Sequence, residues 1–144
     1  MNQFALQQNQ LASVQNQLNQ LNQNFKINNI NNQQEIKFKN GGRYVGQVIN
    51  GLREGKGIFY WKDGDRYEGD YRNNQPEGKG IYYFNEEPFK GDRHEGDYRN
   101  DKKEGKGIYY YHNGDREMGD YYNGNPIGKH VMLTRDGEVE INNY

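Results

Sequence analysis

The chain has 144 residues, of which 31% are hydrophobic, and a mean hydropathy of −1.36, so it fits one small domain with little conventional core and no deep catalytic pocket. Its 19 basic and 20 acidic residues give a net charge of −1, which argues against a whole-molecule field that would attract nucleic acid or an anionic membrane. The absence of cysteine excludes disulfides and thiolate metal sites and favours an intracellular location.

The first 34 residues differ in composition from the rest. They contain 20 Asn or Gln residues and a single charged residue, Lys26. We therefore predict an Asn/Gln-rich amphipathic docking helix over residues 1–26 and a linker over 27–40. The helix is predicted from apolar residues at the three-then-four spacing of a coiled-coil seam, interrupted at Gln7: Phe4, Leu11, Val14, Leu18, Leu21 and Phe25. A disordered leader is the alternative.

The remainder of the chain is built of internal repeats. A first motif, typified by Tyr-Glu-Gly-Asp-Tyr, recurs at steps of 23, 27 and 23 residues, beginning at Tyr44, Tyr67, His94 and Glu117. A second motif, typified by Gly-Lys-Gly-Ile, advances by the same steps from Gly55, Gly78, Gly105 and Gly128. A third glycine column ends at Gly137, where a further unit begins. The sequence thus predicts about four repeats plus a capping half-repeat over residues 41–141.

Each repeat contains two runs with the period-two pattern of β-strands, joined by a polar turn such as residues 73–78. Consecutive hairpins of this kind predict an antiparallel sheet without crossovers. Alternation places Tyr67, Gly69 and Tyr71 on one face. Glycine is unfavourable inside a strand, so its recurrence predicts that a tyrosine ring lies directly on the backbone there.

The opposite face carries basic columns that alternate with acidic ones, which predicts cross-strand ion pairs. The lysine column is Lys56, Lys79, Lys106 and Lys129, and the aspartate column is Asp70, Asp97 and Asp120.

Tyr-x-Gly-x-aromatic followed by Gly-Lys-Gly-aliphatic at 23-residue spacing resembles the MORN (membrane occupation and recognition nexus) repeat family. The resemblance covers residues 41–141, and the fourth copy departs from it at Glu117 and His130. It implies an all-β fold, an elongated single-layer antiparallel sheet of MORN β-hairpin repeats, here preceded by an N-terminal α-helix. In the family such sheets carry a groove and serve as scaffolds.

The sheet has more aromatic side chains than one layer buries on both faces, which indicates a partner. We predict a non-enzymatic scaffold or adaptor subunit without cofactors, which binds other protein subunits as a helix or an extended peptide in the groove. The predicted groove residues are Tyr44, Tyr60, Trp61, Tyr67, Tyr71, Tyr83, Phe84, Tyr98, Tyr110, Tyr111 and Tyr121. The resemblance implies a radial-spoke-like ciliary axoneme or another cytoskeletal complex in the cytoplasm. A homodimer is also open.

Two other functions were weighed. A phospholipid-binding or membrane-tethering module is the alternative, suggested by the lysine column together with Arg53, Lys102 and Lys103, although neighbouring glutamates largely cancel their charge. For an enzyme, no nucleophile, base and orienting group are discernible. The histidines His94, His112 and His130 sit at three different repeat positions, so we expect surface or groove histidines and no metal site.

The 27-residue step reflects four extra residues within positions 85–90, in an inter-repeat turn. They are predicted to present Phe89 beyond the sheet edge, either as a contact point or as a tolerated insertion.

Overall fold

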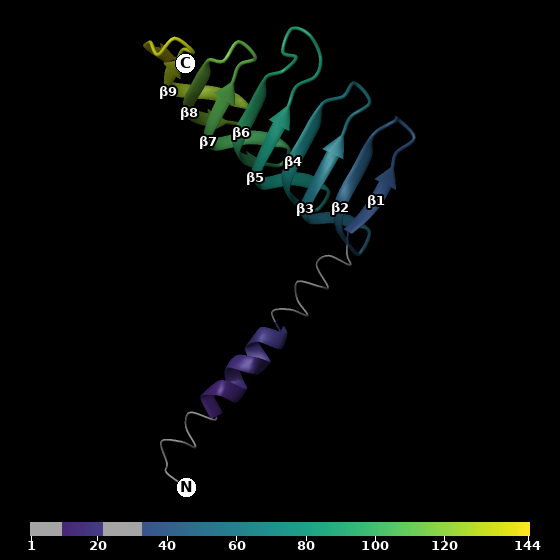
Figure 1. Cartoon of the computed structure of the whole chain (residues 1–144). Coiled ribbons are helices and arrows are strands. Elements are labelled where there is room, and N and C mark those ends of the chain that lie inside the picture. Colours follow the sequence, from purple (N-terminus) through teal and green to yellow (C-terminus); the bar gives the residue numbers. More distant parts are fainter. Residues whose placement is uncertain (1–9, 22–32) are drawn as a thin grey trace. The chain divides into compact units, whose positions relative to one another are not determined.

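The computed structural model describes residues 10–21 and 33–144, and the chain divides into two compact units, Met1–Gln33 and Gln34–Tyr144. Residues 10–21 form a helix (Figure 1). Within these described ranges, no helix combines the length and apolar character that crossing a bilayer requires.

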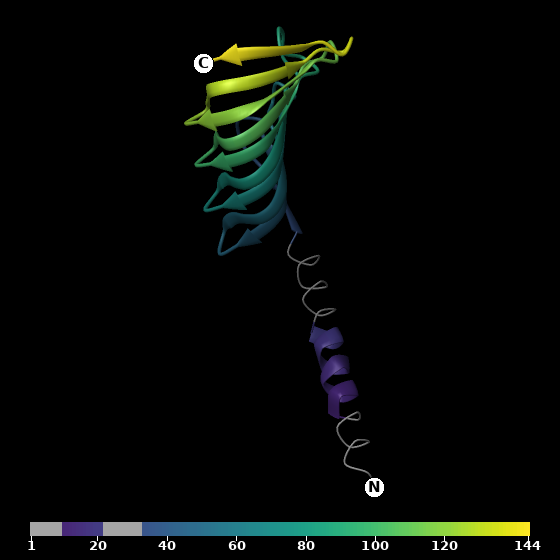
Figure 2. The same ribbon diagram turned by 90° about the vertical axis from the view of Figure 1, so that its left-hand side faces the viewer.

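The second unit is one antiparallel sheet in which ten strands follow each other in chain order (Figures 1 and 2). The strands are β1 (Gln33–Lys37), β2 (Arg43–Ile49), β3 (Leu52–Tyr60), β4 (Arg66–Arg72), β5 (Gln75–Tyr83), β6 (Arg93–Arg99), β7 (Lys102–Tyr110), β8 (Arg116–Tyr122), β9 (Asn125–Leu133) and β10 (Val139–Asn143). The prediction of an all-β, single-layer sheet of hairpins, preceded in the sequence by a helix, is confirmed.

The predicted linker over residues 27–40 is wrong at residues 33–37, which form β1 at the edge of the sheet. Its side chain Ile36 packs against the hydrophobic core, and Glu35 forms an ion pair with Arg43 at 3.3 Å. The sheet therefore begins before Gly41. Composition concealed this strand because its polar residues resemble the preceding Asn/Gln-rich segment.

The hairpin turns are shorter than predicted. In the second hairpin, Asn73 and Asn74 both have positive φ, 49° and 69°, which makes a two-residue turn whose twist matches the flanking strands. Residues 75–78, predicted as turn, therefore belong to β5. Asparagine tolerates this backbone conformation, so the pair closes the hairpin without further residues.

The turns of the second, third and fourth hairpins are each tied to the preceding repeat by a glutamate. Glu54 accepts a hydrogen bond from the backbone N–H of Asn73 at 2.8 Å, and Glu77 accepts one from Asn100 at 3.1 Å. Glu104 does the same for Asn123 at 3.1 Å. These carboxylates join successive repeats along the side of the sheet that carries the hairpin turns.

The strands bend where the first glycine of the Gly-Lys-Gly motif lies. Gly78 has a φ of 93°, and the register between β4 and β5 shifts between Gly69 and Tyr71, as in a β-bulge. Comparable shifts occur in the other three hairpins. Figure 2 shows the resulting bend of the strands.

A ring was predicted to lie on the glycine of the first motif, and Tyr67 does reach Gly69 with its hydroxyl end, but its ring also lies on the second glycine of the Gly-Lys-Gly motif, Gly80, directly opposite. A Cβ added to Gly80 would lie 2.5 Å from Cε2 of Tyr67, so only glycine leaves room for the fully buried tyrosine ring. Tyr44 lies on Gly57 and His94 lies on Gly107 in the same way. In the fourth hairpin the ring and the glycine exchange strands, because His130 of β9 stands at the position of the second glycine and lies on Gly119 of β8.

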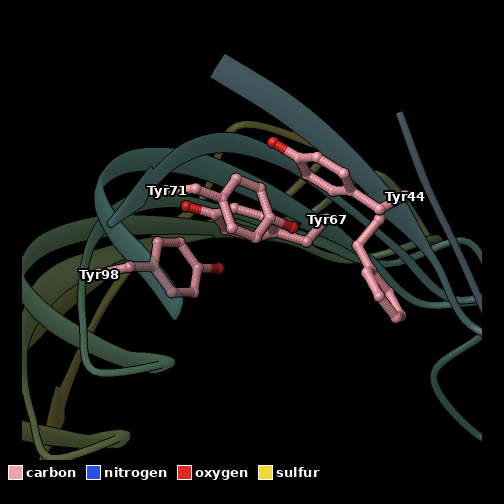
Figure 3. Close-up of a cluster of buried hydrophobic side chains, with 5 residues drawn as sticks. Tyr44, Tyr67, Tyr71 and Tyr98 are labelled. Atoms are coloured by element: carbon pink, nitrogen blue, oxygen red, sulfur yellow. The ribbon is translucent and has the colours of Figure 1, made fainter. Parts of the chain in front are cut away.

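The buried rings form an edge-to-face ladder that crosses the repeats. The Tyr67 ring centroid lies 5.4 Å from that of Tyr71 and 4.9 Å from that of Tyr98, both at nearly perpendicular angles. Figure 3 shows these rings together inside the bend of the sheet. The ladder runs through Tyr44, Tyr71, Tyr67, Tyr98, His94, Tyr121 and His130, and it ends on Tyr144, which is exposed. This geometry suits the quadrupoles of the rings, and the ladder replaces a second layer as the core.

Candidate functional site: the ring face

The register assigns each strand side chain to one of two faces, because residues directly opposite each other in neighbouring strands point the same way. Tyr67 pairs with Phe59 on one side and with Tyr82 on the other, and we call the face that they share the ring face. Arg66 pairs with Tyr83 on the opposite face, which we call the outer face.

A row of aromatic side chains runs along the ring face beside the buried ladder. Neighbouring centroids are 4.7–5.7 Å apart, with tilted ring planes. This ring row consists of Phe38, Phe59, Trp61, Tyr82, Phe84, Tyr109 and Tyr111, and all but Phe59 keep part of their surface in solvent. An uninterrupted, half-exposed aromatic row is typical of a binding surface.

Aspartates at the inter-repeat turns hold the ring row in place. The Tyr82 hydroxyl donates to Asp65 at 2.6 Å, and the backbone N–H of Asn85 donates to the other oxygen of the same carboxylate at 2.7 Å. Tyr109 donates to Asp92 in the same way at 2.8 Å. Burial and the hydrogen bond to Asp65 raise the pKa of Tyr82 above its usual range. These hydrogen bonds hold the Tyr82 and Tyr109 rings in place within the row.

Two cations lie over the rings. The Arg53 guanidinium is 5.1 Å from the Phe59 centroid and 5.4 Å from that of Tyr71. The Lys103 ammonium is 5.1 Å from the Tyr109 centroid, and burial lowers its pKa. Within the described residues, neither cation forms an ion pair with a carboxylate.

The positions equivalent to Arg53 and Lys103 in the second and fourth hairpins are Pro76 and Pro126. Arg53 and Pro76 contribute to a recess of about 140 Å³ on the ring face. Its other lining residues are Phe59, Trp61, Tyr71, Asn74 and Asp101. The recess combines aromatic walls with one cation and one carboxylate, and burial raises the pKa of Asp101.

The family model described as MORN repeat matches residues 44–66, 67–86 and 94–116. The chain carries three MORN repeats. Such repeats fit a scaffold or binding role, and proteins built of them are generally not enzymes. The fourth unit, from Glu117 onward, lies outside the matched residues. A comparison with curated protein sequences finds no significant match.

The chain also matches solved structures. The TCP domain of SAS-4 (dCPAP) of Drosophila melanogaster, solved in complex with a proline-rich motif of Ana2 (dSTIL), is 14% identical, with a TM-score of 0.30. The match covers 78% of this chain and 90% of that chain. At that level of similarity the likeness carries no functional information.

The structure divides the predicted groove residues of the MORN sheet. Five of the eleven are only 0–6% exposed and belong to the core ladder, so they do not offer a surface to a partner: Tyr44, Tyr67, Tyr71, Tyr98 and Tyr121. Three lie in the ring row: Trp61, Phe84 and Tyr111. The single predicted groove is thus corrected to a buried ladder beside a half-exposed row.

The other three predicted groove residues lie on the outer face of the MORN sheet, under arginines. The guanidinium of Arg66 lies 4.0 Å from the Tyr83 ring centroid. Arg43 covers Tyr60 at 4.1 Å, and Arg93 covers Tyr110 at 3.7 Å. Sequence alternation separates Tyr82 from Tyr83, but adjacent aromatic residues concealed which of the two faces the groove.

The predicted ion pairs of the outer face are present between successive hairpins. Lysine ammonium and aspartate carboxylate groups lie 2.6–3.1 Å apart in the pairs Lys56–Asp70, Lys79–Asp97 and Lys106–Asp120. Three lysines of the outer face are therefore neutralised by aspartates, whereas neither ring-face cation forms an ion pair within the described residues.

Two histidines are buried, which corrects their expected place on the surface or in a groove. His94 takes the ladder position of the tyrosine in the third MORN repeat and lies 2.8 Å, through Nδ1, from the Tyr98 hydroxyl. Burial, with a contribution from Lys103, lowers the pKa of His94 to about 3, so the imidazole is neutral at physiological pH. Within the described residues, no group of side chains is arranged to hold a metal.

Glu117 stands at the tyrosine position of the fourth unit and is buried. Its carboxylate accepts hydrogen bonds from the Tyr111 hydroxyl at 2.9 Å, the Asn142 amide at 2.8 Å and the Tyr144 hydroxyl at 3.0 Å. Burial acts to raise the pKa of Glu117, but these hydrogen bonds and nearby His130 outweigh it, so the pKa lies below its usual range. No sequence motif predicted these hydrogen bonds of Glu117.

Phe89, in the inserted turn, is 53% exposed, and its ring centroid lies 6.0 Å from that of Phe84. It therefore extends the ring row at the edge of the sheet. Its role as a contact point stays a prediction.

The predicted docking helix is described only in part. Phe4 and Phe25 lie outside the described residues. The other four seam residues, Leu11, Val14, Leu18 and Leu21, are 49–70% exposed on the helix over residues 10–21.

Proposed function

We propose that the chain is a non-enzymatic scaffold subunit that binds a segment of a partner protein on the ring face. The observation that carries the proposal is the ring row, in which Trp61, Tyr82 and Phe84 form a rigid, half-exposed aromatic surface. Large aromatic side chains held in one conformation lose little entropy on binding and dominate the energy of protein interfaces.

The cations define the chemistry of the partner segment. Arg53 and Lys103 lie at the border of the ring row and form no ion pair within the described residues. A partner segment with apolar side chains over the rings and carboxylates beside these cations would cover the rings and form ion pairs with the cations. An amphipathic helix or an extended peptide offers this combination.

Membrane-surface binding is the weaker alternative. It depends on the lysine column of the outer face, and three of these lysines already form ion pairs with aspartates. Attraction to an anionic bilayer requires several uncompensated cations. Flotation with anionic vesicles at physiological salt is expected to leave the protein unbound.

The cellular setting is proposed from the resemblance of the repeats to MORN proteins of radial-spoke heads. We place the protein in the cytoplasm, in a ciliary axoneme or another cytoskeletal assembly. Localisation of a tagged chain away from cilia and cytoskeleton would contradict this setting without affecting the ring-face proposal.

The test is affinity purification of tagged variants from the protein's own cells. The double variant Trp61→Ser/Phe84→Ser is expected to lose the partner that the parent chain recovers in stoichiometric amount. The matched control is Tyr122→Ser, because Tyr122 is 63% exposed and lies on the outer face. Circular dichroism confirms that both variants are folded. Equal recovery by a folded ring-face variant would contradict the proposal.

A further inference from the structure

The helix over residues 10–21 carries a narrow apolar seam. Leu11, Val14, Leu18 and Leu21 follow each other at spacings of three, four and three residues, and all four are 49–70% exposed. The positions that flank this seam are Gln10, Gln15 and Gln17. The apolar stripe therefore occupies only two of the seven positions in each heptad.

The width of this stripe distinguishes between kinds of partner. A helix that packs on a sheet or a globular core shows an apolar stripe at least about 100° wide, with a third apolar position in each heptad. A stripe confined to two positions is the seam of a helix that pairs with another helix. The helix thus suits another helix better than it suits the ring face.

The lack of charge on the helix is compatible with pairing to a second copy of itself. Residues 10–21 contain no charged side chain. When two identical helices pair, flanking residues meet others of the same kind, so charged flanks of one sign would repel each other and uncharged glutamines do not. The only side-chain hydrogen bond within the described helix joins Gln15 to Asn19 and is long, at 3.5 Å. The amides of one helix are therefore available to those of the other.

The length of the helix gives a reason for pairing. A helix of about 12 residues is marginal in water by itself, so burial of the seam must supply most of its stability. We propose that this helix pairs with the same helix of a second copy, forming a homodimer through Leu11, Val14, Leu18 and Leu21. The proposal goes beyond ring-face binding and stands independently of it.

Dimerisation would give the scaffold two ring faces in one assembly. Two linked binding surfaces bind a partner that presents two sites more tightly than either surface alone, without any new contact. Weak binding at each single ring face would thereby give a tightly bound complex.

Sedimentation equilibrium of the full chain over a broad concentration range tests the proposal. The weight-average mass is expected to rise from 17.0 kDa toward twice that value. In the variant Leu11→Gln/Leu18→Gln, the dissociation constant of the dimer is expected to rise about a hundredfold or more, since two leucines of each helix lose their burial. Helicity measured by circular dichroism is expected to fall with dissociation.

The control is Asn16→Ala/Gln20→Ala, which changes the helix surface away from the seam and is expected to leave the dimer intact. A parent chain that stays monomeric at every concentration would overturn the proposal, including the case in which its seam is protected from solvent by its own sheet. Dimerisation that persists unchanged in the leucine variant would overturn it too, because the contact would then lie elsewhere.

Discussion

At the scale of single residues, glycine and ring form one unit in this sheet. Gly80 lies so close to the Tyr67 ring that a methyl group has no space. The variant Gly80→Ala is expected to lower the free energy of unfolding by about 1–3 kcal/mol, because the ring must leave its position. Urea denaturation measures this. Lys79→Ala, the neighbouring exposed position, is expected to change stability by less than about 1 kcal/mol, and an equally small effect of Gly80→Ala would contradict the packing described.

His94 makes stability depend on pH. Its pKa is lowered to about 3 in the folded protein, whereas an unfolded histidine has a pKa near 6.5. Below pH 6.5 the unfolded chain binds a proton that the folded chain does not, so stability falls as the pH falls, by up to about 1.4 kcal/mol for each pH unit. The fall ends near the folded pKa.

The measurement is the unfolding free energy of the parent chain and of His94→Phe between pH 7 and pH 4. The difference is expected to shift in favour of the variant as the pH falls. Parallel pH profiles for the two proteins would show that His94 is not buried in its neutral form.

The ring-on-glycine packing followed from the repeated glycine columns, because a residue that is costly in a strand needs a steric reason. The buried histidines and Glu117 did not follow. His94 and Glu117 each take the place of a tyrosine with a polar group of different shape, and His130 takes the place of a glycine. Polar residues are predicted at the surface unless their hydrogen-bond partners are known. Those partners, such as Tyr144 for Glu117, lie up to 27 residues away in the sequence.

At the scale of elements, the last strand depends on one carboxylate. Glu117 in β8 binds Asn142 in β10 and Tyr144 just beyond it, and β10 pairs with only one neighbouring strand. In Glu117→Ala these donors lose their acceptor, at a cost of about 1–3 kcal/mol for each group that stays buried. The amides of β10 are therefore expected to exchange hydrogen much faster, while those of β4 and β5 are unaffected.

Hydrogen exchange resolved by residue checks this, with Glu138→Ala as the control because Glu138 is exposed. Unchanged protection of β10 in Glu117→Ala would mean that backbone pairing with β9 alone holds the strand.

Strand order and hairpin spacing were predictable, because the two motif columns agree through the insertion. The ends of the elements were less predictable. Pro76 argued for a turn, yet it lies in β5 opposite Tyr71, since the two asparagines before it already complete the turn. β1 was missed because its edge position requires little apolar character.

At the scale of the whole molecule, the single layer has to serve as core and as surface at once. The bend of the strands (Figure 2) buries one row of rings and leaves the ring row beside it half-exposed. A period-two pattern assigns side chains to a face but does not distinguish these two rows on the same face. The partner surface could thus be predicted to be aromatic and to lie on the tyrosine side. Its residues Tyr82 and Tyr109, and its cations Arg53 and Lys103, required the structure.

Site-specific photo-crosslinking in cells tests the ring face most directly. A photoreactive phenylalanine analogue in place of Trp61 is expected to form a covalent adduct with a partner protein. The same analogue in place of Tyr122, on the outer face, is expected to form none. Adducts from position 122 and none from position 61, in folded proteins, would contradict the account and assign partner binding to the outer face.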